Sequence, residues 1–182
     1  EGNVYLSTLI QSKTALDGRL ALEVALNILQ IPSLQGLNLQ VKWPNDLYSP
    51  QGKWGGILVE PLSVNQAIVG VGINLNTPPV ENADQPITSL HRLGLHQIER
   101  LSLIAELYTA IQQAAQWFEH GSYNLAERFN HHAIWLNQQV EFEHAQGKLQ
   151  GRFQGISNDG AVIIKTDQAQ QFYQGRLRLA EI

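Results

Sequence analysis

The chain has 182 residues, of which 43% are apolar and 15% are charged, and its formal net charge is -4. This composition is typical of one or two globular domains and excludes a disordered chain, and the acidic balance argues against nucleic-acid binding by this chain. Because there is no cysteine, disulfide bonds, cysteine metal sites and cysteine nucleophiles are excluded.

The first three quarters of the chain alternate between strand and helix patterns. In chain order we expect a strand at 3–9, a helix at 16–30, strands at 39–43, 47–48, 54–62 and 67–75, a loop at 76–85, and helices at 101–118 and 123–132. The first helix keeps its polar residues Glu23, Asn27 and Gln30 on one narrow stripe, which predicts that it is largely buried. The two long apolar strands are typical of the middle of a sheet that is covered on both faces.

The pattern changes after about residue 139, where short β-like segments alternate with tight turns. These segments lie at 140–143, 149–156, 161–165, 171–173 and 176–179. Short strands at this spacing are typical of a small barrel. We therefore expect two domains, 1–137 and 138–182.

The ends of the chain and its apolar runs predict a location. No apolar run reaches the length of a membrane span and no signal peptide is visible, so we expect a cytoplasmic protein without a membrane partner. The sequence begins Glu1-Gly2 and contains no methionine. We therefore expect a fragment of a longer chain.

Four glycines interrupt the two most apolar strands: Gly55 and Gly56 in one, and Gly70 and Gly72 in the next. Glycine inside a strand gives up packing and costs roughly 0.5–1 kcal/mol relative to alanine. A cluster of such positions indicates that something lies flat on the backbone. The ordinary alternative is that the glycines relieve crowding under a packed helix.

Polar side chains flank this glycine cluster. Asn45 and Asp46 follow one strand, Lys53 lies in a turn, and Asn74 ends the last apolar run. Each has an ordinary explanation, as a turn pair, a solvated lysine and a strand stop. The sharper interpretation is an anionic-ligand site, with Lys53 as a point charge, Asp46 as a candidate metal ligand and the glycines as a backbone platform.

Three segments resemble the signature of the biotin–protein ligase family. They are KWPND at 42–46, KWGGILVE at 53–60 and GVGIN at 70–74. They match in order, spacing and apolar surroundings, and looser agreement covers the rest of the chain. The resemblance implies an α/β (α+β) catalytic domain of the class II synthetase and biotin–lipoate ligase type, with a mixed sheet and helices, followed by an SH3-like β-barrel.

The resemblance also implies a reaction and its residues. Biotin and ATP with Mg²⁺ give biotinyl-5′-AMP, and a lysine of a biotin carboxyl carrier protein then takes the biotin. Lys53 resembles the catalytic lysine between the biotin carboxylate and the ATP α-phosphate. Asn45 and Asp46 resemble the ATP-binding pair, with Asp46 also as Mg²⁺ ligand and as a catalytic group that orients the acceptor lysine. Asn74 resembles a residue on the adenylate side. The implied biotin-binding residues are Lys53, Gly55, Gly56, Ile57, Leu58, Gly70 and Gly72.

This chain departs from the family in two places. The family has a glycine- and arginine-rich loop just before the strand that opens this chain, and that loop is not among these 182 residues. We therefore expect weak or no ligase activity from these residues alone. Pro86 stands where some relatives place an aromatic residue on adenine.

Two other functions remain open from the sequence: a related lipoate-type ligase, and a non-catalytic module for biotin sensing or carrier docking. The oligomeric state is open as well. His131 and His132 point to different faces of a helix, so we expect no metal there. Arg176 and Arg178 alternate on the last strand, where we expect a solvated face; the alternative is that they reach the nucleotide from the barrel.

Overall fold

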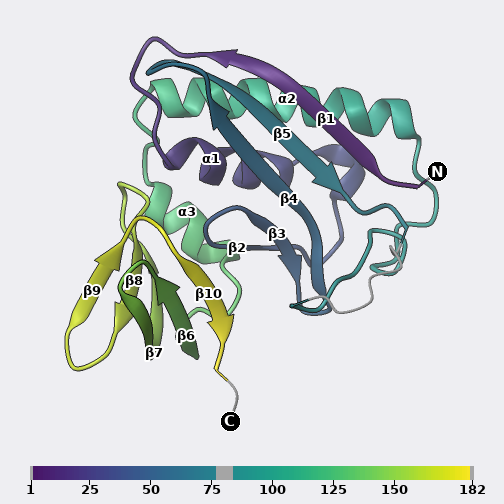
Figure 1. The fold of residues 1–182 in the computed structure, drawn as a ribbon. Helices are drawn as coiled ribbons and strands as arrows, with labels where there is room; N and C mark the ends of the chain where they lie inside the picture. Colours follow the sequence, from purple (N-terminus) through teal and green to yellow (C-terminus); the bar gives the residue numbers. More distant parts are fainter. Residues whose placement is uncertain (1, 77–83, 181–182) are drawn as a thin grey trace.

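The computed structural model describes residues 2–76 and 84–180, which form two antiparallel sheets and three α-helices (Figure 1). The strands of the first sheet are β1 (Val4–Gln11), β2 (Gln40–Lys42), β3 (Asp46–Ser49), β4 (Gly52–Pro61) and β5 (Gln66–Ile73). Those of the second are β6 (Gln139–His144), β7 (Gly147–Ile156), β8 (Val162–Lys165), β9 (Ala169–Phe172) and β10 (Arg176–Leu179). The helices are α1 (Arg19–Ile28), α2 (Arg100–Glu119) and α3 (Leu125–His132), with a 3-10 turn at Pro32–Leu34.

Helices cover only one face of the first sheet, whose strand order is β1-β5-β4-β3-β2 (Figure 1). Every second residue of β5, including Val69 and Val71, is buried against the helices, as period-two alternation requires. On the other face Tyr5 is 79% and Leu58 56% exposed. The expectation that β4 and β5 are covered on both faces is therefore wrong: the glycines, rather than packed side chains, occupy their second face.

An irregularity in the pairing of β3 with β4 sets which residues share the open face. Leu47 pairs with Gly55 and Tyr48 with Lys53, so Trp54 is an extra residue in β4. The indole of Trp54 is fully buried and donates to the carbonyl of Tyr48 at 2.7 Å. A bulge of this kind reverses the alternation of side chains along a strand. Lys53 consequently shares the open face with Gly56.

The second sheet has the order β10-β6-β7-β8-β9 and follows α3, as the change of pattern after residue 139 predicts. β9 and β10 lie at the two ends of this order, and no pairing between those two strands is found in the described residues. The boundary between 137 and 138 stays a prediction.

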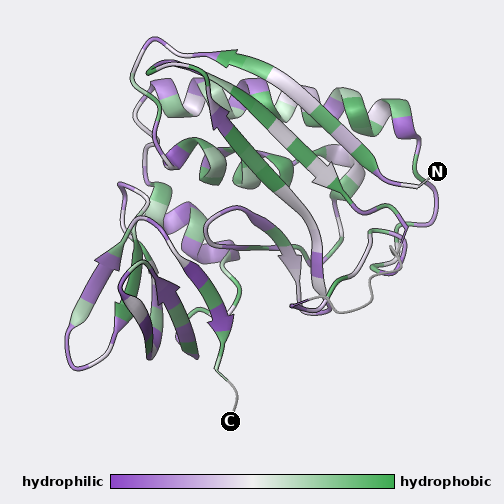
Figure 2. Ribbon diagram, in the orientation of Figure 1, coloured by the Kyte–Doolittle hydropathy of each residue, from purple (hydrophilic) through white to green (hydrophobic). Residues whose placement is uncertain are grey.

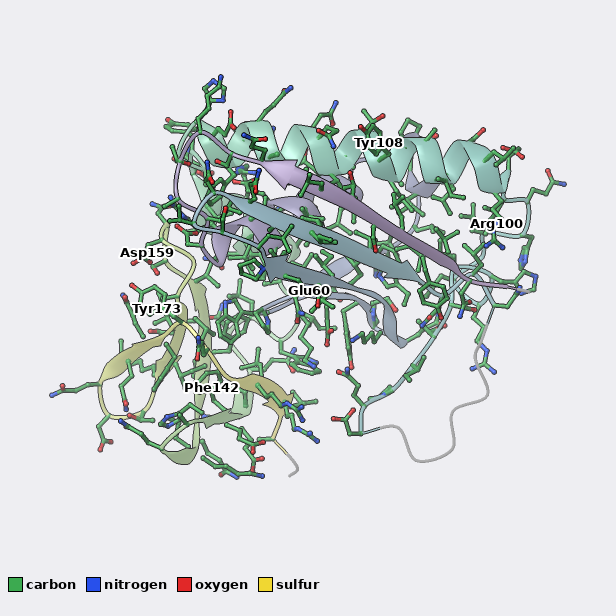
Figure 3. All side chains as sticks on the ribbon, turned by 45° about the horizontal axis from the view of Figure 1, so that its top comes forward. Glu60, Arg100, Tyr108, Phe142, Asp159 and Tyr173 are labelled. Atoms are coloured by element: carbon green, nitrogen blue, oxygen red, sulfur yellow. The ribbon has the colours of Figure 1, made fainter. Side chains whose placement is uncertain are left out.

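The two sheets share one hydrophobic core. Buried apolar residues of both sheets and of the three helices belong to one cluster, and Figure 2 shows hydrophobic residues along β4 and β5 of the first sheet. The indole of Trp43 donates to the carbonyl of Gly160 at 3.0 Å, and its ring lies 5.9 Å from that of Phe142, which Figure 3 labels within the second sheet. Asn130 of α3 accepts from the amide of Ile156 at 2.9 Å. These contacts hold the second sheet beside the β2–β3 turn.

Candidate functional site

An ion pair joins Asp46, the first residue of β3, to Lys53, which follows the turn between β3 and β4. The Nζ of Lys53 is 2.5 Å from Oδ1 of Asp46. The Asp46 side chain is 12% exposed and that of Lys53 is 31% exposed, so the pair is screened on one side and open on the other. Asp46 pairs with Gly56 on β4, and a Cβ on Gly56 would lie 3.3 Å from Cε and Nζ of Lys53. The missing side chain of Gly56 therefore makes room for Lys53 to lie across the sheet.

A second lysine and an amide complete the surroundings of Asp46. Oδ2 of Asp46 lies 3.2 Å from Nζ of Lys42 and accepts from Nε2 of Gln85 at 3.2 Å. Lys42 also donates to Oε1 of Gln85 at 2.5 Å. Its ammonium lies 5.5 Å and 5.6 Å from the centres of the Tyr48 and Trp135 rings, within the range of cation–π attraction.

These contacts shift the titration of the buried groups. Burial alone would raise the pKa of Asp46, but the hydrogen bond and charge of Lys53, with the charge of Lys42, outweigh it and hold that pKa below its ordinary value. Burial lowers the pKa of Lys42, and Asp46 opposes this only in part. Burial also raises the pKa of Tyr48 to about 12. Asp46 is therefore a carboxylate at neutral pH.

The glycines border a shallow cavity of about 370 Å³ on the open face. Its lining includes Tyr5 and Ser7 of β1 and, among the residues that the sequence singles out, Asn45, Asp46, Lys53, Gly56, Ile57, Leu58, Gly70 and Gly72. The side chain of Ile57 is buried, so it contributes backbone, and its carbonyl already accepts from Nδ2 of Asn45 at 2.7 Å. The cavity thus has a flat floor of backbone and apolar side chains, and Lys53 and Asp46 lie at its end.

Two predicted residues lie outside this cavity. Gly55 faces the helices, because a Cβ there would lie 3.1 Å from Cδ1 of Leu47 and 3.2 Å from that of Ile73. Asn74 donates through Nδ2 to the carbonyl of Thr88 at 3.2 Å and is absent from the cavity lining. The structure brings the other eight predicted residues together, and their roles stay predictions.

A larger cleft of about 770 Å³ lies on the other side of the ion pair, between β2, β3 and β10. It shares Asn45, Asp46 and Lys53 with the glycine-floored cavity. Arg178 also lines it and bonds Asp84, with Nη2 at 3.0 Å from Oδ2, while 39% of its side chain stays exposed, as the expected solvated face requires. Arg176 lines the same cleft but keeps 70% of its side chain exposed.

Two residues of this site carried no role in the sequence interpretation. Lys42 begins the KWPND segment, and its spacing of four residues from Asp46 is the signal that could assign it, because the two residues pair across the β2–β3 turn. Gln85 had no such signal, because it belongs to a loop expected only to be polar. Pro86, noted as a departure from the family, lines the cleft and accepts through its carbonyl from the amide of Lys53 at 2.9 Å.

The described residues offer no preformed metal cage. Within 2–76 and 84–180 there is no group of three or more His, Asp or Glu side chains that could hold a metal ion. Among the described residues, Asp46 is the only carboxylate at the ion pair itself, and both of its oxygens already contact Lys53, Lys42 or Gln85. This arrangement does not fit a Mg²⁺ bound directly to Asp46.

Within residues 2–76 and 84–180, none of the helices has the length and apolarity needed to cross a membrane.

Comparisons with known families match both parts of this chain. Residues 3–74 match the biotin/lipoate A/B protein ligase family, and residues 135–177 match the biotin protein ligase C-terminal domain. The bifunctional ligase/repressor BirA of Bacillus subtilis is 26% identical over 180 residues, covering 92% of this chain and 55% of the relative. The biotin–[acetyl-CoA-carboxylase] ligase of Paracoccus denitrificans is 30% identical over 138 residues, covering 70% of this chain and 57% of the relative.

Solved structures agree on the fold. The biotin protein ligase of Aquifex aeolicus, as a point mutant in complex with biotin, superposes with a TM-score of 0.85 at 24% identity, covering 99% of this chain and 79% of that one. The complex of the same ligase with biotin and ATP gives a TM-score of 0.82. The expected fold class is confirmed, except that the described strands of the first sheet pair antiparallel throughout and do not form the mixed sheet that the resemblance implies. This chain belongs to the biotin–protein ligase family. It spans about half the length of the curated BirA relatives that it matches.

Proposed function

We propose that this chain provides the lysine side of the active site of a ligase that activates biotin with ATP and transfers it to a lysine of a biotin carboxyl carrier protein. The main support for this proposal is the Lys53–Asp46 pair, which lies at the junction of the glycine-floored cavity and the larger cleft. Biotin has a flat, largely apolar ring system and a carboxylate. The floor suits the rings, and the free side of Lys53 suits the carboxylate.

In the first step a biotin carboxylate oxygen attacks the α-phosphorus of ATP, and the bond to pyrophosphate breaks. Two anions must approach each other, and the developing charge spreads over the phosphoryl oxygens. The ammonium of Lys53 offsets that repulsion, and Asp46 fixes its direction through the 2.5 Å contact. Asn45 and Asp46, which line both cavities, are the proposed contacts to the nucleotide, together with Asn74 on its adenylate side.

In the second step the acceptor amine attacks the acyl carbon of the mixed anhydride, and AMP leaves. Asp46 is a carboxylate at neutral pH, so it can accept a hydrogen bond from the incoming lysine in place of Lys42. Mg²⁺ accompanies ATP on its phosphates in this proposal. No step uses an ion on Asp46, because the described residues offer no group of three or more carboxylate or imidazole side chains to complete its coordination. A reaction that consumes ATP also agrees with a cytoplasmic location.

The test is biotin-dependent AMP release by the full-length protein on a carrier domain, with Lys53→Ala beside Lys148→Ala. Lys148 has the same chemistry but pairs with Glu141 on the second sheet, at 2.9 Å with 56% of its side chain exposed. Removing one such electrostatic contact costs about 10²–10³ in turnover, so Lys53→Ala should lose that much and Lys148→Ala nothing. Equal activity in the two variants would refute the role of Lys53. Turnover with lipoate but not biotin would assign the lipoate-type function.

A further inference from the structure

The side chain of Gln85 joins Lys42 and Asp46 into one network. Its Oε1 lies 2.5 Å from Nζ of Lys42, and its Nε2 lies 3.2 Å from Oδ2 of Asp46. The other oxygen of Asp46 contacts Lys53. The amide thus satisfies an ammonium with its carbonyl and a carboxylate with its N–H, a combination for which the Asn and Gln side chains are suited.

The backbone on either side of Gln85 is held in place. After it, the carbonyl of Pro86 accepts from the amide of Lys53, and the amide of Thr88 donates to the carbonyl of Lys53, both at 2.9 Å. Gly52 allows this approach, since a Cβ there would lie 2.6 Å from the carbonyl oxygen of Pro86. Before it, Asp84 is bonded by Arg178 of β10 through both its carbonyl, at 3.3 Å, and its carboxylate, at 3.0 Å. The position of the amide is therefore set by β4 on one side and by the second sheet on the other.

The charges explain what this amide controls. The Lys42 side chain is only 10% exposed, so its ammonium needs protein acceptors. Gln85 supplies the shorter of its two oxygen contacts, and Asp46 supplies the other. Without Gln85, Asp46 would be the one oxygen partner left to the ammonium among the described residues, and the ammonium would draw that carboxylate toward β2. Lys53 would then lose the partner that directs it.

We propose that Gln85 is a positioning residue for the adenylation step: it holds Oδ2 of Asp46 and shares the ammonium of Lys42, so that Oδ1 stays on Lys53. This inference rests on the proposed function, because the rate it controls is that of the Lys53-dependent step. It also gives the second sheet a part in the reaction, through the Arg178–Asp84 contact.

The kinetic test compares Gln85→Leu and Gln85→Glu with Gln154→Leu in the full-length protein. Glutamate keeps the length and the acceptor for Lys42 but has no N–H for Asp46, while Gln154 is exposed on β7 and bonds none of these residues. Both Gln85 variants should lose about 10- to 100-fold in kcat for adenylate formation, the worth of one hydrogen bond to a charged group. The KM for biotin should stay within about twofold. Unchanged kcat in either Gln85 variant would overturn the proposal.

A second measurement needs no substrate. The pKa of the Asp46 carboxyl is read from its ¹³Cγ shift during an NMR pH titration of the wild type and of Gln85→Leu. Because Gln85 donates to the ionised carboxyl, the pKa should rise in the variant. An unmoved pKa would overturn the proposal even if the wild type does not turn over biotin, which would separately refute the proposed function.

Discussion

Replacing Gly56 by alanine separates the position of Lys53 from the stability of the fold. A Cβ at this position would lie 3.3 Å from Cε and Nζ of Lys53 and 3.8 Å from Oδ1 of Asp46. The first distance is tighter than a comfortable carbon contact of about 3.5–4.0 Å, so the lysine has to move by a few tenths of an ångström. The contact is with the far end of a flexible side chain, so the backbone has no need to move.

The expected effects of Gly56→Ala on stability and on kcat have opposite signs. Alanine in a strand gains roughly 0.5–1 kcal/mol over glycine from the unfolded state, so the free energy of unfolding should stay level or rise. The Lys53–Asp46 contact, a hydrogen bond between charged groups worth about 1.5–3 kcal/mol, is weakened. Loss of that contribution in the transition state corresponds to about 10- to 100-fold in kcat for adenylate formation.

The assay is biotin-dependent pyrophosphate release, with urea denaturation of the same samples. Gly70→Ala is the matched control, because its Cβ would make only ordinary contacts, at 3.6 Å from Oγ of Ser7 and 3.8 Å from the carbonyl oxygen of Leu58, and none to Lys53. Gly70→Ala should raise the KM for biotin without lowering kcat. A Gly56→Ala enzyme with wild-type kcat, or one altered in KM alone, would refute the reasoning about Lys53.

Two further predictions concern charges in the described structure. Glu23 is fully buried and accepts two hydrogen bonds from Arg128, at 2.6 and 2.9 Å. Arg128→Ala should therefore lower the free energy of unfolding by about 3–5 kcal/mol. The control is Arg152, which is exposed on β7, and a loss in urea denaturation no larger than that of Arg152→Ala would contradict this. The folded pKa of Asp46 lies below its ordinary value because Lys53 outweighs the effect of burial, so its contribution to stability is present above about pH 4 and is lost as the pH falls through the folded pKa. Denaturation between about pH 2 and 6 should show a steeper acid loss in the wild type than in Asp46→Asn, and parallel curves would count against the ion pair.

Short-range patterns in the sequence determined most of the elements and singled out Lys53 as the candidate catalytic lysine. Period-two alternation in β1 and β5 and the three-and-four spacing over 101–118 are local properties of the chain, so they predict the strands and α2 without knowledge of the fold. The KWPND and KWGGILVE segments likewise place Asp46 and Lys53 on neighbouring strands, because one hairpin joins them. The helix expected at 16–30 is shorter in the structure, at Arg19–Ile28, since Gly18 and the loop before it take the first residues.

Only the tertiary structure decided which side of the sheet each residue faces. Strict alternation along β4 would place Lys53 with Gly55 on the helix-covered face, and the extra residue Trp54 reverses this. Gln85 reaches Lys42 and Asp46 from a loop about 40 residues further along the chain, and Arg178 reaches Asp84 from the second sheet. Contacts between distant segments depend on how the sheets and helices pack, and a bulge depends on the register between two strands, so neither leaves a periodic signal in the chain itself.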